Sequence, residues 1–168
     1  MSTKTRLQGQ LTRSRNFLEK ILADFKTPQE WTHQVHPKAN HALWVAGHLT
    51  TVDNFFTSLV APEKAKDLPG YNEKFGMGSQ PVADATAYPA TDELLHNFRE
   101  RRETLLGVLD SMTDEQLAEK MPPGSPDFFT DKASAFELAA WHEGMHSGQA
   151  TIARRALGKK PLMGGSQD

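Results

Sequence analysis

Trp141-His142-Glu143-Gly144-Met145-His146 is the stretch of this chain that says most about its fold and its chemistry. Residues four apart on an α-helix project from one face, so the two imidazoles can bind one metal ion together if the stretch is helical. Protein zinc sites take three or four protein ligands, so at least one more must come from elsewhere. The remaining histidines are the candidates: His33, His36, His41, His48 and His96.

The same residues fit the H-E-x-x-H pattern of zinc metalloproteases, in which the glutamate acts on a metal-bound water. The rest of that pattern is missing from the sequence. Metzincins need a glycine and a third histidine further on, where this chain has Gln149 and Ile152. Thermolysin-like enzymes use a downstream glutamate, but Asp168 is the only acidic residue after Glu143. We therefore expect an upstream third ligand and no peptidase activity.

Four stretches carry apolar residues at the three- and four-residue spacing of an amphipathic helix. They run over about 5–25, about 40–60, 91 to about 112, and about 131–157. Asn40 is the expected N-cap of the second helix, and Gly158 is expected to end the fourth. A short capped helix is expected at 113–120, where Thr113 and Gln116 have capping-box spacing. The pattern predicts an all-α fold.

Two of these helices place histidines in the middle of the apolar stripe that faces the core. His48 lies between Val45 and Val52 on the second helix, and His142 and His146 lie on the fourth. Burying an imidazole is costly unless its ring nitrogens are hydrogen-bonded or bound to an ion. A hydrogen bond would be enough for one core histidine, but a shared divalent ion explains all three at once.

The other histidines are weaker candidates. His41 is two turns before His48, so it lies either at the mouth of a cavity or, as we prefer, exposed in the first helical turn. His33 and His36 fall in the connection before that helix, where solvent exposure is the default. His96 points away from the apolar stripe of the third helix, so we expect it at the surface.

Composition narrows the class of protein. A chain of 168 residues with 38% hydrophobic residues suits one domain, 1–168, and its net charge of -2 gives no basic surface for nucleic acid. The absence of cysteine excludes disulfides, thiolate zinc sites and a cysteine nucleophile, so any thiol in the chemistry arrives with a substrate. We see no signal peptide and no apolar run of about 20 residues, which predicts a cytoplasmic protein without a membrane span.

The connections between helices 2 and 3 and between helices 3 and 4 are long. Residues 61–90 are rich in proline and glycine, which permits a crossover that leaves the second and third helices parallel, or a lid over the metal end. Pro122-Pro123-Gly124-Ser125-Pro126 delays the last helix. The residues 164–168 are expected to form a loose tail.

Four segments carry a resemblance to a known family: 41–49 (HALWVAGHL), 75–79 (FGMGS), 142–149 (HEGMHSGQ) and 154–158 (RRALG). The sequence resembles the DinB-like superfamily of DinB/YfiT-type metalloenzymes, and the resemblance covers nearly its whole length. It implies a four-helix bundle with up-down-down-up topology and a divalent metal held by one histidine of the second helix and two of the fourth. Those positions are His48, His142 and His146 here.

The resemblance also implies an activity and an assembly. Members carry out metal-dependent transfer or isomerisation with low-molecular-weight thiols such as bacillithiol or mycothiol, and hydrolases are suspected among relatives. Many members pair, so we expect a homodimer. Leu43, Trp44 and Phe56 lie beside the His48 stripe and are expected to offer apolar surface to a partner helix.

Three neutral imidazoles leave a metal ion its full charge and at least one open position, which is the arrangement of a catalytic site. Imidazole donors favour Zn or Ni, with Fe or Mn as alternatives. Such an ion lowers the pKa of a bound water or thiol. We therefore predict a thiol-dependent S-transferase or related transferase acting on a small-molecule substrate. The alternatives are a metal-dependent hydrolase and a non-catalytic metal-binding bundle.

Five further residues are candidates for the site, each with a plainer alternative. Glu143 is a base or hydrogen-bond partner, or else a solvent-facing residue about 100° around the helix from the first histidine of the pair. Gln149 either hydrogen-bonds in the cavity or packs between helices. Trp44 lines the cavity or fills the core. Arg101 or Arg102 either reaches an anionic group of the substrate or extends to solvent.

Overall fold

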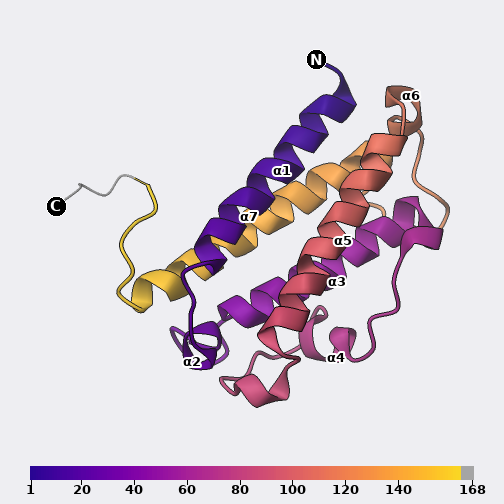
Figure 1. Cartoon of the computed structure of the whole chain (residues 1–168). Helices are drawn as coiled ribbons and strands as arrows, with labels where there is room; N and C mark the ends of the chain where they lie inside the picture. Colours follow the sequence, from indigo (N-terminus) through magenta and orange to yellow (C-terminus); the bar gives the residue numbers. More distant parts are fainter. Residues whose placement is uncertain (164–168) are drawn as a thin grey trace.

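The computed structural model describes residues 1–163, and these residues form only helices and connections (Figure 1). The long helices are α1 (Thr3–Leu22), α3 (Ala42–Val60), α5 (Thr91–Ser111) and α7 (Lys132–Ala156). The short helices are α2 (Pro28–Trp31), α4 (Tyr71–Phe75) and α6 (Asp114–Leu117), with single 3-10 turns at Pro62–Lys64 and Ala85–Ala87. No strand occurs within 1–163, which confirms the all-α prediction. The tail expected at 164–168 lies outside the described residues.

Side chains with short polar groups begin several of these helices. Asp131 accepts a hydrogen bond from the Ser134 backbone N–H at the start of α7, and Thr113 and Gln116 form the predicted capping box at α6. The basic residues Arg154 and Arg155 lie in the last turn of α7, where they oppose the negative end of the helix dipole.

The N-cap of α3 differs from the prediction. His41, and not Asn40, caps the helix, because its Nδ1 accepts a hydrogen bond from the Trp44 N–H at 3.1 Å. The Nε2–H of the same ring donates to the Val82 carbonyl at 3.0 Å, which ties the connection to the helix start. His41 is fully buried, so its expected exposure was wrong. Burial lowers the pKa of His41 to about 4, and the ring is neutral at pH 7.

The long helices pack side by side. α1 contacts α7 and α5, and α3 contacts α5 and α7, so the two helices that carry the candidate histidines are neighbours. One apolar cluster lies at the α2 and α4 end and includes Leu18, Leu49, Phe98 and Ala150. A second lies at the α6 end and includes Leu11, Phe56, Leu105 and Ala139.

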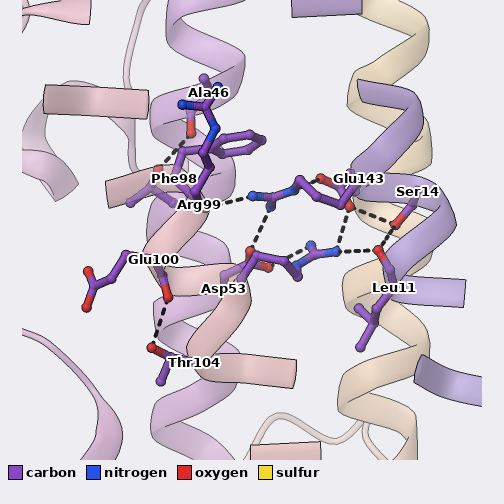
Figure 2. Close-up of polar contacts among 12 residues, drawn as sticks. Leu11, Ser14, Ala46, Asp53, Phe98, Arg99, Glu100, Thr104 and Glu143 are labelled. Atoms are coloured by element: carbon purple, nitrogen blue, oxygen red, sulfur yellow. Dashed lines mark hydrogen bonds and ion pairs between the residues drawn. The ribbon is translucent and has the colours of Figure 1, made fainter. Parts of the chain in front are cut away.

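A layer of buried charge separates the two apolar clusters. The layer consists of Arg15 of α1, Asp53 of α3, Arg102 of α5 and Glu143 of α7, and each lies between the two sets of apolar residues on its own helix. Figure 2 labels the two carboxylates, Asp53 and Glu143. All four are less than 10% exposed. Every long helix therefore contributes one charge to the layer, and the charges sum to zero.

The two arginines of this layer bridge the two carboxylates. Arg15 contacts Glu143 through Nε at 2.6 Å and Asp53 through Nη2 at 2.9 Å. Arg102 contacts Asp53 at 2.9 Å through both Nε and Nη2, and Glu143 at 2.6 Å through Nη1. The Glu143 carboxylate also accepts a hydrogen bond from the neighbouring Ser14 hydroxyl at 2.7 Å. Desolvating charges is expensive, and this ring of direct contacts is what offsets the cost.

Both guanidinium groups remain cationic in the layer. Burial lowers the pKa of Arg102, but Asp53 and Glu143 outweigh burial, so the pKa is raised. For Arg15, burial and the neighbouring Arg102 lower the pKa, against the pull of the same carboxylates. An arginine starts from so high a pKa that it keeps its proton in either case.

None of the helices within 1–163 is long and apolar enough to cross a membrane.

We predict that the charged layer dominates the stability of the fold. Asp53→Asn should lower the free energy of unfolding by about 3–5 kcal/mol, because it leaves two buried arginines with one carboxylate between them. Glu19→Gln is the matched control, since Glu19 pairs with the half-exposed Arg99, and should cost less than about 1 kcal/mol. Denaturant unfolding followed by circular dichroism measures both. Equal stabilities of the two variants would contradict the prediction.

Candidate metal centre

The three histidines selected from the sequence meet between α3 and α7. The Nε2 atom of His142 lies 2.8 Å from Nε2 of His146 and 3.3 Å from Nε2 of His48. One ring nitrogen from each residue falls within 4.8 Å of the other two. The four-residue spacing on α7 brings the first pair together, and the packing of α3 against α7 adds the third ring.

Hydrogen bonds on the far side of two rings determine which nitrogens face the cluster as lone pairs. His48 donates through Nδ1–H to the Phe75 carbonyl at 2.7 Å, and His146 donates through Nδ1–H to Gln149 Oε1 at 2.9 Å. A neutral imidazole carries one N–H, so both Nε2 atoms are then acceptors. His142 can supply at most one proton to them. Three ring nitrogens therefore converge with at most one proton among them, an arrangement that is compatible with a shared cation.

Residues outside the cluster place these two hydrogen-bond acceptors. Gly47 precedes His48, and a Cβ at Gly47 would lie 2.3 Å from the Phe75 ring, so only glycine lets α4 pack this close to α3. That packing brings the Phe75 carbonyl to the imidazole. Asn40 donates to Gln149 Oε1 at 3.0 Å, which orients the amide oxygen toward His146. Partners of this kind fix the tautomer and the ring orientation of metal-binding histidines.

The histidines of the cluster are neutral at physiological pH. Burial, and to a smaller extent the neighbouring imidazoles, lowers the pKa of His142 to about 4 and that of His146 to about 3. Burial also lowers the pKa of His48. Neutral imidazole is the form that binds metal ions.

The donor set fits a divalent metal ion. A metal–nitrogen bond of about 2.1 Å places neighbouring ligand nitrogens roughly 3.0–3.4 Å apart. The two Nε2 pairs that include His142 are spaced at 2.8 and 3.3 Å. Within residues 1–163, the cluster contains His48, His142 and His146, with no fourth histidine or carboxylate. The cluster is therefore compatible with a metal site that keeps a position open to a small molecule.

A pocket of about 620 Å³ opens directly onto the three rings. Its walls come from α3, from the 61–90 connection, from the segment before α7 and from α7 itself. Besides the histidines, they are formed by Trp44, Thr51, Val52, Phe55, Phe56, Asn72, Gly76, Met77, Gly78, Phe128, Leu138, Trp141 and Met145. The long 61–90 connection thus does lie against the predicted metal end.

Two of the further candidates do belong to this centre. Trp44 lines the pocket and stacks on the His48 ring, with centroids 4.7 Å apart and planes 10° from parallel. Its indole N–H donates to Ser79 Oγ at 3.0 Å. Gln149 contacts His146 as described, which is the hydrogen-bonding alternative for that residue. Trp141 also lines the pocket, at its edge, and is 64% exposed.

The solvent-facing interpretation of Glu143 was wrong, because the side chain is fully buried. Glu143 does not line the pocket, so it is not placed as a base. It is a hydrogen-bond partner, but its partners are not the histidines. Its carboxylate is held by Arg15, Arg102 and Ser14 in the charged layer (Figure 2). The offset of about 100° from His142 points Glu143 toward α1 and α5, where those partners lie.

The two arginines of α5 do not reach the pocket either. Arg102 is buried and bonded to the carboxylates of the charged layer, and Arg101 is buried against Glu100, Asn54 and the Lys64 carbonyl. Neither extends to solvent, and neither lines the pocket. A role in binding an anionic substrate group at this pocket is therefore wrong for both.

Sequence reasoning missed the parts of the site that depend on tertiary packing. The Phe75 carbonyl is a backbone group, which every residue offers, so its role has no residue-type signal. Phe128 lines the pocket from a proline-rich stretch without helical periodicity. The glycine before His48 was a usable signal, because a glycine in the middle of an apolar helix indicates a close approach of another segment.

Comparison with known proteins bears on the fold and the family. The family model of the DinB superfamily matches residues 10–150. A crystal structure of a conserved protein from Enterococcus faecalis is similar at a TM-score of 0.72 and 22% sequence identity, covering 95% of this chain and 99% of that chain. At that identity the likeness concerns the fold alone. No curated protein matches the sequence significantly.

We predict that the cluster binds one divalent ion per chain. His48→Ala should weaken zinc or nickel binding by more than the 10- to 100-fold typical of losing an outer hydrogen-bond partner, because it removes a ligand. His96→Ala is the control, since His96 is exposed on α5. Metal content after dialysis and competition with a chromophoric chelator measure both. Unchanged metal affinity in His48→Ala would exclude this residue as a ligand.

Proposed function

The chain belongs to the DinB superfamily, and from that premise we propose that it is a metal-dependent enzyme whose ion is held by His48, His142 and His146. The observation that carries the proposal is the convergence of three Nε2 atoms with at most one proton among them at the floor of a pocket of about 620 Å³. Zn or Ni suits three imidazoles best, and Fe or Mn is the alternative.

The surroundings of the cluster favour a thiol over water as the nucleophile. Activating water works best with a nearby base, but Glu143, the carboxylate next to His142, is fully buried and paired with arginines. Within 1–163, no aspartate or glutamate lines the pocket. A free thiol has a pKa near 8.5, against about 15.7 for water, so a thiol needs a base far less than water does. The bound ion would supply the positive charge that stabilises the sulfur as a thiolate.

The residues of this chain then have distinct tasks in S-transfer. The three imidazoles stay neutral and leave the charge of the ion uncancelled. The Phe75 carbonyl and Gln149 hold two of the rings in the tautomer that presents Nε2. Trp44 covers one face of the His48 ring, which limits access of water from that side. The new bond joins sulfur to an electrophilic carbon of the acceptor, the bond from that carbon to its leaving group breaks, and the thiol proton goes to solvent.

A hydrolase and a non-catalytic metal-binding protein are the alternatives. The absence of a lining carboxylate within 1–163 counts against the first. The open side of the cluster counts against the second, because structural zinc sites are closed by a fourth protein ligand.

We further propose that the long helices form a four-helix bundle with up-down-down-up order. In support, the end of α1, the starts of α3 and α5 and the end of α7 share one apolar cluster, and Figure 1 draws α3 and α5 leading away from that end. The homodimer implied by the family resemblance is also a proposal, and the buried residues of the described chain weaken it. Leu43, Trp44 and Phe56 are buried within one chain, so they do not offer the partner surface expected of them.

We predict metal-dependent thiol transfer. The metal-loaded protein should speed the reaction of bacillithiol, mycothiol or another small thiol with 1-chloro-2,4-dinitrobenzene, releasing chloride, and His142→Ala should reduce the rate to that of the uncatalysed reaction. His96→Ala should keep the full rate. Absorbance of the thioether product gives the rate. If thiols show no metal-dependent rate and an ester or amide does, hydrolysis replaces this proposal.

A further inference from the structure

The pocket over the histidines has a buried deep end and an aromatic mouth. Phe56, Trp44 and His146 are no more than 5% exposed and form the deep end. Phe128 and Trp141 are 66% and 64% exposed and stand at the opening. A molecule that fills the pocket therefore has one end at the three Nε2 atoms and its body between aromatic side chains.

The lining carries almost no polar groups beyond the histidines. Among the described residues, no lysine, arginine, aspartate or glutamate lines the pocket. Thr51 and Asn72 are the polar side chains of the wall, and the Thr51 hydroxyl already donates to the His48 carbonyl at 2.8 Å. Arg15 and Arg102 point into the charged layer and not into the pocket. A charged group on the body of a ligand would lose water here and meet no partner.

The size of the pocket limits the ligand. At about 30 Å³ for each water-sized group, a pocket of about 620 Å³ holds roughly 20 non-hydrogen atoms. Aromatic rings on the walls prefer offset-stacked or edge-on contacts with another ring, and such contacts add to the stabilisation from area burial.

We propose that this pocket selects an uncharged acceptor substrate with an aromatic or branched aliphatic body, held with its reactive end at the histidines and its body against Trp141 and Phe128. The assignment of the reactive end rests on the proposed function. The preference for an uncharged body rests on the lining alone. The site discriminates against acceptors that carry carboxylate, sulfonate or phosphate groups on the part of the body that the pocket walls enclose.

Two probes of similar size and opposite charge state test the lining without any metal. 2-Naphthol is neutral and naphthalene-2-sulfonate is an anion, and both fit within the volume of the pocket. Isothermal titration calorimetry on the metal-free full chain should give 2-naphthol a dissociation constant at least tenfold lower than that of the sulfonate. The variant Trp141→Ala should weaken 2-naphthol about tenfold.

The matched control is Ile152→Ala. Ile152 is 58% exposed on the same helix as Trp141 but does not line the pocket, so this variant should bind 2-naphthol like the unaltered protein. Circular dichroism checks that both variants fold. Equal affinity for the two probes, or unchanged 2-naphthol binding in Trp141→Ala, would overturn the proposal.

A separate titration keeps the proposed function distinct from this inference. Cobalt added to the same protein should develop visible absorption bands, and their absence would count against the metal site while leaving the probe result to decide the selectivity of the pocket. Bands without a preference for 2-naphthol would count against the apolar substrate alone.

Discussion

The arrangement of the long helices depends on a buried ring of two arginines and two carboxylates. Arg15, Asp53, Arg102 and Glu143 come from four different helices, and each makes contacts of 2.6–2.9 Å with both opposite charges. Ion pairs are directional and expensive to break, whereas apolar contacts tolerate sliding. The layer therefore fixes the helices along their axes more strictly than the two apolar clusters can.

The position of the candidate metal centre follows from that constraint. Asp53 lies little more than one turn beyond His48 on α3, and Glu143 adjoins His142 on α7. The ring that sets α3 against α7 also sets the separation between the histidines of the two helices. The glutamate of the His-Glu-x-x-His segment thus has a structural task, and the segment resembles a protease motif without its catalytic arrangement. What remains for chemistry is a set of three neutral imidazoles that face an apolar pocket.

The sequence predicted the elements that depend on local pattern and missed those that depend on tertiary contacts. Helical spacing located the long helices and brought His48 together with His142 and His146, because side-chain register on a helix follows from residue number. Helical spacing did not predict the roles of Arg102 and Glu143. A charged residue on a core-facing stripe can be interpreted only when its partners on other helices are known. It also did not predict the burial of His41. This ring hydrogen-bonds to both the start of α3 and Val82, and it is the buried N-cap of the helix.

The central claim is that three histidines hold one metal ion with a position open to a thiol. X-ray absorption at the metal edge of the zinc-loaded protein tests it most directly. Without thiol, the account predicts three imidazole nitrogens at about 2.0–2.1 Å and one further oxygen or nitrogen ligand. When a small thiol is added, sulfur at about 2.3 Å should replace that further ligand. A spectrum with four protein ligands that a thiol leaves unchanged, or with fewer than three imidazoles, would contradict it.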